Sequence, residues 1–233
     1  MSKALVILSG GQDSTTCAAI AKRDFTEVHA ITFNYGQRHS IEIESAIAVA
    51  KALDLTTHEI IDLGARILKS SSPLVSGNSL GKYQSIADLP GGVEPTFVPG
   101  RNILFLTIAA NRAAALGCTD IFIGVCEEDF GGYWDCRQDF IDQMELAIGL
   151  GVFGSPKFTI LTPLMKLNKA DSVKLAVEFL DDDFDRVMSL THTCYAGVKG
   201  GCGECHACLL RDRGFTEAEI DDPLWLSKNK EKG

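Results

Sequence analysis

The stretch that decides the fold is residues 4–16, which read ALVILSGGQDSTT. Its first five residues are apolar with no polar alternation, a pattern typical of a strand covered on both faces of a parallel sheet. Two glycines then predict a tight turn, and Asp13 is expected to cap a helix that continues to Arg23. The sequence therefore predicts a strand, a glycine turn and a helix at the start of an α/β protein.

The glycine turn has the chemistry of an anion site. Paired glycines let the backbone approach a ligand closely, and the helix start offers unpaired N–H groups and the positive end of its dipole. Ser9, Ser14 and Thr15 add hydroxyl donors. The turn lacks the lysine of a G-x-x-x-x-G-K-[ST] loop and the spacing of G-x-G-x-x-G, so it is neither of those phosphate-binding motifs. The alternative is a tight turn that binds nothing.

The rest of the chain continues the alternation of strands and helices. Strands are predicted at residues 27–33, 57–62, 120–125 and 158–161, and helices at residues 40–53, 101–116, 138–150 and 169–180. Serines, prolines and glycines interrupt the pattern between residues 69 and 99. Because an irregular loop of about thirty residues is uncommon unless it serves a site, we expect this segment to flank or cover one.

Composition limits the class of protein. Of 233 residues 45% are hydrophobic, which is typical of a globular chain and excludes a disordered or fibrous one. Acidic residues outnumber basic ones by 31 to 22, and the net charge of −9 argues against a nucleic-acid partner. No apolar stretch approaches the ~20 residues of a membrane span, and the N-terminus does not resemble a signal peptide. We expect a cytoplasmic protein without membrane contact.

Four of the eight cysteines are clustered. Cys194, Cys202, Cys205 and Cys208 follow the spacing C-x7-C-x2-C-x2-C. Four thiolates make a closed tetrahedral site, which indicates structural Zn²⁺; an iron–sulfur cluster, unligated cysteines, or His192 or His206 as substitute ligands are the alternatives. We expect an α/β domain over residues 1–190 and a small cysteine-rich lobe over residues 191–233, packed on it.

The glycine turn resembles the S-G-G-x-D-S pyrophosphate loop of the N-type ATP pyrophosphatases, which cleave ATP between its α and β phosphates. The resemblance implies a Rossmann-like parallel sheet of the adenine nucleotide alpha hydrolase type. It also implies that the adenine lies near the end of the second strand and that Asp13 helps to hold Mg²⁺. The residues implied to bind ATP are Leu8, Ser9, Gly10, Gly11, Gln12, Asp13, Ser14, Thr15, Thr16, Cys17, Ala18, Phe33 and Arg38.

Further blocks extend the resemblance to the 7-cyano-7-deazaguanine synthase family, the nitrile-forming enzymes of queuosine biosynthesis. They read FNYGQRH at residues 33–39, FVPGRN at 97–102, GVCEED at 124–129, YWDCR at 133–137 and TPLM at 162–165. Together with Lys169, the loop and the cysteines, they cover residues 4–211 in order. Trp134 departs from the proline that is usual in the fourth block, which leaves the placement of the substrate open.

The second resemblance implies a reaction. The enzyme joins 7-carboxy-7-deazaguanine, ammonia and ATP through an acyl-adenylate, an amide and a second adenylation, and a homodimer is expected. The residues implied to be catalytic are Asp13, Arg101 and Lys169. Those implied to bind the acid or ammonia are Phe97, Glu127, Asp129, Tyr133, Asp135 and Arg137. Asp135 is expected to accept hydrogen bonds from the guanine-like edge, with Tyr133 or Phe97 stacked on the ring. Cys136 is not expected to act as a nucleophile, because adenylation needs no thioester.

Two other functions remain open. One is a different adenylating enzyme with the same loop, such as a tRNA-thiolating or amide-forming pyrophosphatase. The other is a zinc module that binds nucleic acid or protein and makes no use of the loop.

Overall fold

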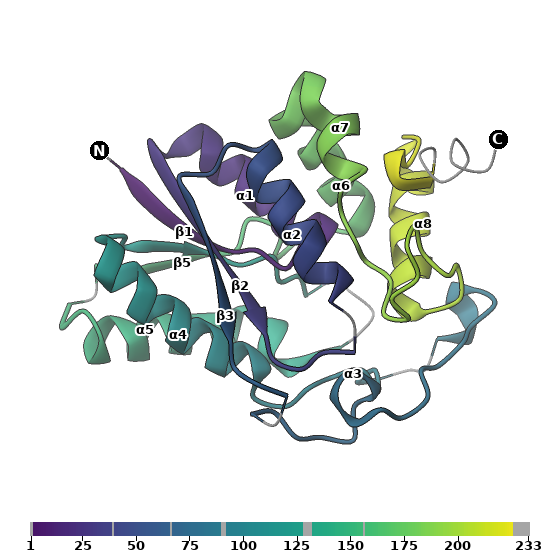
Figure 1. Cartoon of the computed structure of the whole chain (residues 1–233), viewed down its shortest axis with the longest axis horizontal. Helices are drawn as coiled ribbons and strands as arrows, with labels where there is room; N and C mark the ends of the chain where they lie inside the picture. The colour runs from purple at the N-terminus through teal and green to yellow at the C-terminus, as the bar shows by residue number, and fades with distance from the viewer. Residues whose placement is uncertain are drawn as a thin grey trace.

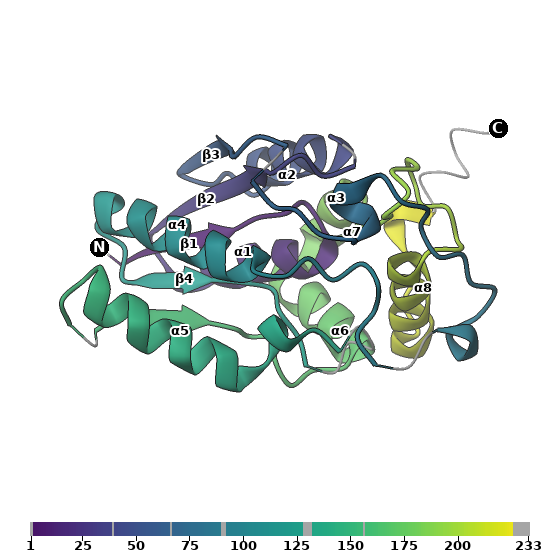
Figure 2. The same ribbon diagram turned by 90° about the horizontal axis from the view of Figure 1, so that it is seen from below.

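The computed structural model describes residues 2–38, 40–65, 67–89, 92–127, 132–155 and 157–225. Its centre is a sheet of parallel strands in the order β3-β2-β1-β4-β5. Figure 1 shows the sheet, and β3, β2, β1 and β4 are labelled side by side in Figure 2. The strands are β1 (Lys3–Ile7), β2 (Glu27–Asn34), β3 (Thr57–Asp62), β4 (Asp120–Phe122) and β5 (Thr159–Leu161). The chain winds outward from β1 to β3 and then returns to β4, so a crevice opens beyond the carboxyl ends of β1 and β4.

Helices cover both faces of the sheet, as the two views in Figures 1 and 2 show. One core contains residues of α1, α2, α6, α7 and α8, and the other contains residues of α4 and α5. The helices are α1 (Gln12–Asp24), α2 (Ile41–Ala52), α3 (Pro73–Ser76), α4 (Arg101–Leu116), α5 (Gln138–Gly151), α6 (Lys169–Leu180), α7 (Phe184–Met188) and α8 (His206–Ala218). Single turns of 3₁₀ helix lie at Ile86–Asp88, Trp134–Cys136 and Asp181–Asp183.

The first strand shows why the apolar run has no polar positions. Ala4 and Val6 pack into the core on the α1 face, and Leu5 and Ile7 pack into the core on the α4 face. All four are buried because side chains alternate across a strand that has helices on both sides. The predicted α/β fold with a parallel sheet is confirmed.

Two details of the prediction are wrong. Asp13 is not the cap of α1: the helix begins at Gln12 after Gly11, and no side chain caps it. The hydroxyls of Ser14 and Thr15 instead turn back onto the Gly11 carbonyl, at 3.1 and 2.9 Å. The strand expected at residues 120–125 ends at Phe122, because the backbone there leaves the sheet to border the crevice.

In its described residues, 69–89 and 92–99, the segment of residues 69–99 contains α3 and one 3₁₀ turn and is otherwise irregular. It crosses from the α2 side of the molecule to the cysteine-rich region, where the Tyr83 amide donates to the Glu204 carbonyl at 2.8 Å and Lys82 pairs with the Glu204 carboxylate at 2.7 Å. Figure 2 shows this course beside α8.

The boundary predicted between residues 190 and 191 stays a prediction. In the structure α8 packs along α6, and its Phe215 belongs to the same core as α1. None of the helices in the described ranges is long and apolar enough to cross a membrane.

Candidate active site

A cavity of about 640 Å³ lies at the carboxyl ends of the strands. Its walls come from the glycine turn, the ends of β2 and β4, the starts of α2 and α4, residues 192–195 and one face of α8. This is the position at which open parallel sheets bind their ligands.

The glycine turn is packed tightly against its neighbours. Gly10 has a φ of +84°, and a Cβ atom there would collide with the Glu42 carbonyl oxygen and lie 2.6 Å from the Ala46 nitrogen. The turn is also tied from the opposite side, because the His192 amide donates to the Gly10 carbonyl at 2.8 Å. Only glycine fits at this position. The contacts with α2 on one side and with residues 191–193 on the other hold the turn in place.

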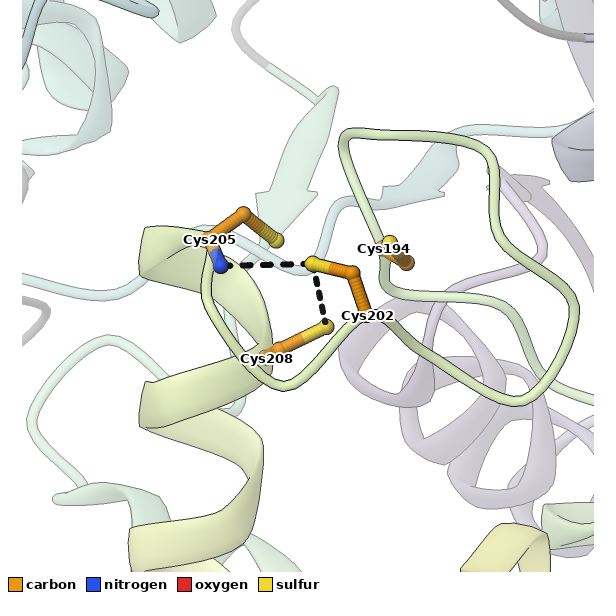
Figure 3. A group of neighbouring side chains, drawn as sticks. All are labelled: Cys194, Cys202, Cys205 and Cys208. Atoms are coloured by element: carbon orange, nitrogen blue, oxygen red, sulfur yellow. Dashed lines mark hydrogen bonds between the residues drawn. The ribbon is translucent and has the colours of Figure 1, made fainter. Parts of the chain in front are cut away.

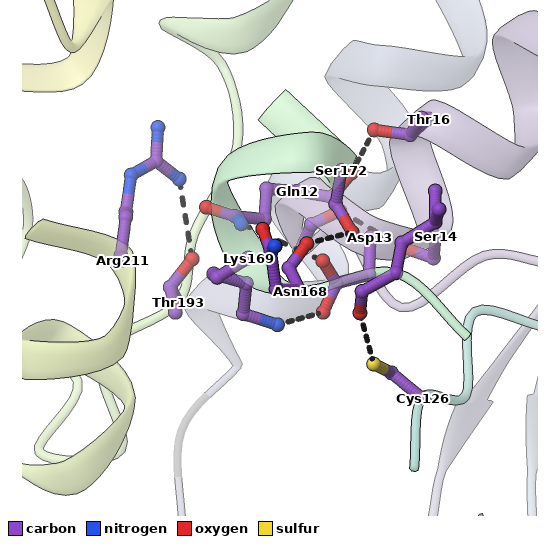
Figure 4. A network of polar contacts seen from close by, with 12 residues as sticks. Gln12, Asp13, Ser14, Thr16, Cys126, Asn168, Lys169, Ser172, Thr193 and Arg211 are labelled. Carbon is purple, nitrogen blue, oxygen red and sulfur yellow. Dashed lines mark hydrogen bonds and ion pairs between the residues drawn. The ribbon is translucent and has the colours of Figure 1, made fainter. Parts of the chain in front are cut away.

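An ion pair joins the turn to α6. Lys169 Nζ lies 2.9 Å from Asp13 Oδ2, and the two side chains are 13% and 26% exposed. Figure 4 shows them pointing toward one another from α6 and α1. On its far side Lys169 packs against Gly214 of α8, where a Cβ atom would lie 2.7 Å from the lysine Cγ. A cation and a carboxylate are thus held beside the glycine turn, and both line the cavity.

Arg101 stands at the first position of α4, surrounded by phenols. Burial by itself acts to lower the pKa of Arg101, but Tyr35, Tyr133, Tyr195 and Asp135 outweigh it and raise the pKa above the usual value. Arg101 is therefore a permanent cation facing the cavity.

Glu42, in the first turn of α2, also lines the cavity. Burial raises the pKa of the Glu42 carboxyl to about 7; the charge of Arg101 acts to lower the pKa, and that of Cys194 acts to raise it. The Glu42 carboxyl and the Arg101 guanidinium therefore share this part of the cavity, and Cys194 is not among the residues that line it.

The predicted acid-binding residues divide into two groups. Tyr133 lines the cavity, and its hydroxyl lies 2.6 Å from Thr96 Oγ1, which in turn donates to Glu94 at 3.0 Å. Phe97 packs behind Tyr133, with ring centroids 5.4 Å apart. Asp135 is buried behind the wall of the cavity, where its Oδ2 accepts a hydrogen bond from the backbone amide of Asn102 at 3.4 Å. Burial raises the pKa of Asp135, and Arg101 acts against this.

The structure brings together most of the residues named from the sequence. Those that line the cavity are Leu8, Ser9, Gly11, Gln12, Asp13, Ser14, Phe33, Arg101, Glu127, Tyr133, Arg137 and Lys169. Those that lie behind or beside it are Gly10, Thr15, Thr16, Cys17, Ala18, Arg38, Phe97 and Asp135. Arg38 is exposed and donates to the Asn78 carbonyl at 3.0 Å. Asp129 lies outside the described residues.

Sequence reasoning missed several residues of the wall, namely Tyr35, Glu42, Asn102, His192, Thr193, Tyr195, His206 and Arg211. Glu42 follows the FNYGQRH block by only three residues, and that proximity was an available signal. The residues of α8 and of positions 192–195 gave no signal, because only tertiary packing brings them to the cavity.

Among the described residues Arg211 is the largest of the fully buried side chains, at 1% exposure. Its guanidinium makes two hydrogen bonds to Asp222, at 2.6 and 2.8 Å, and further bonds to Thr191 at 2.7 Å and Thr193 at 3.2 Å. Figure 4 shows the contact with Thr193. Because His192 between these threonines bonds to the glycine turn, Arg211 connects α8 to that turn.

Arg211→Met is expected to lower the free energy of unfolding by about 3 kcal/mol, because it leaves the Asp222 carboxylate buried without its cation. Urea denaturation measures this loss. The control is Arg213→Met, which breaks an i,i+4 pair with Glu217 on the surface and should cost less than about 1 kcal/mol. Equal losses in the two variants would contradict the role given to Arg211.

The four clustered cysteines converge on one point (Figure 3), with all four sulfur atoms within 4.8 Å of one another. The sulfurs of Cys202 and Cys208 lie 3.9 Å apart. Tetrahedral Zn²⁺ with bonds of ~2.3 Å requires sulfur separations of ~3.8 Å, so the donor set fits zinc. His192 is not part of the group, since its ring contacts the Cys194 carbonyl at 2.9 Å.

Hydrogen bonds between neighbouring thiols shift the pKa values of three of these cysteines. Bonds from Cys205 and Cys208 lower the pKa of Cys194, while the bond to Cys194 raises the pKa of Cys205 to about 11 and also raises that of Cys208. Because cysteine binds a metal as the thiolate, a divalent cation at this point would take the place of the thiol protons. With four sulfur ligands the site is closed, which suits a structural metal.

Comparison with known proteins agrees with this geometry. The family described as "Queuosine biosynthesis protein QueC" matches residues 3–219. The chain is 65% identical to a 7-cyano-7-deazaguanine synthase of Gloeobacter violaceus, over 97% of this chain and 96% of the relative.

Similar solved structures are more distant. A protein described as a "predicted subunit of tRNA methyltransferase" from Methanocaldococcus jannaschii is 22% identical, with a TM-score of 0.46 over 72% of this chain and 70% of that one. An NH₃-dependent NAD synthetase from Campylobacter jejuni is 18% identical, with a TM-score of 0.44 over 98% and 82%. The match to the family over nearly the whole length is decisive: the chain belongs to the queuosine biosynthesis protein QueC family.

Proposed function

We propose that this protein converts 7-carboxy-7-deazaguanine, ammonia and ATP to 7-cyano-7-deazaguanine in queuosine biosynthesis. The observation that carries the proposal is that a single cavity holds the glycine turn, the Asp13–Lys169 pair and Arg101 together. The name of the Gloeobacter violaceus relative, at 65% identity, supports the same substrate class.

The chemistry explains why an ATP site is needed. A carboxylate resists attack by ammonia, so one carboxylate oxygen first attacks the α-phosphorus of ATP and expels pyrophosphate. Ammonia then adds to the acyl carbon, and AMP leaves with that oxygen to give the amide. In the second round the amide oxygen attacks the α-phosphorus of another ATP and expels a second pyrophosphate. Loss of AMP with that oxygen, and of two protons from the amide nitrogen, then leaves the nitrile.

The residues of the cavity divide this work by position. The amides after β1 and the start of α1 grip the phosphates, helped by the Ser9 hydroxyl. Lys169 and Arg101 supply positive charge where two electron-rich oxygens approach a polyanion, which lowers repulsion in the transition state. Asp13 holds Lys169 in place from the first turn of α1.

Mg²⁺ belongs to the proposal as the partner of the phosphates. The carboxylates of Asp13 and Glu127 both line the cavity and are the hard oxygen ligands that this ion prefers. When bound, Mg²⁺ neutralises phosphate charge. Zn²⁺ at the four cysteines is proposed to be structural. We also propose that the protein is a cytoplasmic homodimer, and that its partners are small molecules and not nucleic acid.

The decisive experiment incubates the purified protein with ATP, Mg²⁺, ammonium and 7-carboxy-7-deazaguanine, and mass spectrometry detects the products. The proposal expects the nitrile together with AMP and pyrophosphate. AMP formed only with other acids would favour a different adenylating enzyme, and absence of ATP turnover with every acid would favour a non-enzymatic zinc module.

A further inference from the structure

Glu42 differs from the other acidic groups of the cavity. Three carboxylates line it in the part of the chain that the structure describes: Asp13, Glu42 and Glu127. Asp13 accepts from Lys169 at 2.9 Å, and Glu127 accepts from the Gln138 amide at 2.7 Å. Among the described residues no hydrogen-bond partner of the Glu42 carboxylate is found, and no lysine, arginine or histidine reaches it within 4.0 Å.

The surroundings of Glu42 keep this carboxylate in the cavity. Its own backbone is fixed, since the Glu42 carbonyl packs directly on Gly10. Tyr35 and Arg101 lie near enough to interact electrostatically with it, and both line the same cavity. A carboxylate that is partly removed from water and has no donor is costly unless a ligand supplies one.

The chemistry of the proposed substrate meets this need. The pyrimidine edge of a deazaguanine ring carries two parallel N–H donors, the ring N1–H and one N–H of the 2-amino group. A carboxylate has two acceptor oxygens in one plane and can take both bonds at once, as it does with the fork of an arginine. Asp135, to which the sequence assigned this task, lies behind the wall of the cavity.

We propose that the Glu42 carboxylate accepts the N1–H and 2-amino donors of the deazaguanine ring and so selects a 2-amino-4-oxo pyrimidine edge. The inference rests on the proposed function. It makes Glu42 a specificity-determining residue for the acid, with no part in binding ATP or ammonia.

The test compares Glu42→Gln with Glu44→Gln, which changes an exposed glutamate in the same helical turn. The substrates are 7-carboxy-7-deazaguanine and the analogue that lacks the 2-amino group. Wild-type enzyme should show a KM for the analogue roughly 10- to 100-fold above that for the acid. Glu42→Gln should raise the KM for the acid by a similar factor, so that the KM values for the acid and the analogue become nearly equal. The kcat, the melting temperature and the KM values for ATP and ammonium should stay unchanged, and Glu44→Gln should behave as wild type.

Two results would overturn the inference. The first is that the wild-type enzyme uses the acid and the analogue equally well, and this can be measured without any variant. The second is a Glu42→Gln variant whose KM rises for ammonium while its discrimination against the analogue is intact, which would make Glu42 an ammonium site. Both results would leave nitrile formation by the wild type untouched, whereas wild-type enzyme that fails to use the acid at all would refute the proposed function.

Discussion

Asp13→Asn is expected to reduce nitrile formation by about 100- to 1000-fold without unfolding the protein. The substitution keeps the size of the side chain and removes its charge. Lys169 then loses the partner that holds it 2.9 Å away at the glycine turn, and the cavity loses a carboxylate oxygen suited to Mg²⁺. Both losses fall on the adenylation steps. Initial rates of AMP release, measured at saturating ATP and acid, report the effect.

The matched control is Asp139→Asn. Asp139 occupies the same second position of its helix, after Gln138, as Asp13 does after Gln12, but it is exposed and does not line the cavity. Each substitution removes a favourable charge from a first helical turn at a cost of about 0.5 kcal/mol. Asp13→Asn also leaves Lys169 without its anion, so it should lower the melting temperature more than Asp139→Asn does, while both variants stay folded. Only Asp13→Asn should lose activity. Full activity in Asp13→Asn would contradict the role assigned to the pair.

Cys205→Ser is expected to remove zinc and stability together. Three sulfurs remain where four converge within 4.8 Å, and a closed tetrahedral site is no longer complete. Because metal binding energy is folding energy, the free energy of unfolding should fall by about 5 kcal/mol. For a chain of this length that corresponds to a melting temperature lower by roughly 10–20 °C. Atomic absorption measures zinc per chain, and calorimetry measures the transition.

Cys118→Ser serves as the control, since Cys118 is equally buried but lies in the α4 core, far along the chain from the cluster. It should lose about 1 kcal/mol for the buried hydroxyl and keep its zinc. The effect of Cys205→Ser should also reach the cavity, because Cys205 and Cys208 begin the helix that carries Arg211. A Cys205→Ser protein with full zinc and full stability would refute the structural site.

Local sequence sufficed where local physics decides the structure. The unbroken apolar run of β1 predicted a strand buried on both faces, and Gly10 and Gly11 predicted the tight turn that the structure places at the cavity. The helices that begin at Arg101 and Lys169 were placed correctly for the same reason, since both have strong apolar periodicity. The cap expected of Asp13 failed, because its carboxylate has a better partner 156 positions away in the chain.

Tertiary packing decided what the sequence did not reveal. Glu42 looked like an ordinary charge in a first helical turn, where acidic residues are common for reasons of the helix dipole. Arg211 belongs to a residue type that is usually exposed, and only the fold brings Asp222 and Thr191 against it. The carboxylate of Asp135 was a plausible hydrogen-bond acceptor for the acid. Its position behind Asn102 could not be predicted, because it depends on how α4 packs against the turn of residues 134–136.

If this cavity activates a carboxylate by attack on the α-phosphorus of ATP, oxygen from the acid must pass into AMP, and an oxygen-18 experiment follows that transfer. The substrate is 7-carboxy-7-deazaguanine with both carboxyl oxygens labelled, and the phosphate products are analysed by mass spectrometry. The account predicts that each AMP carries one labelled oxygen and that two AMP appear per nitrile. Two results would contradict attack on the α-phosphorus. One is label in inorganic phosphate, and the other is AMP without label while the amide intermediate carries label.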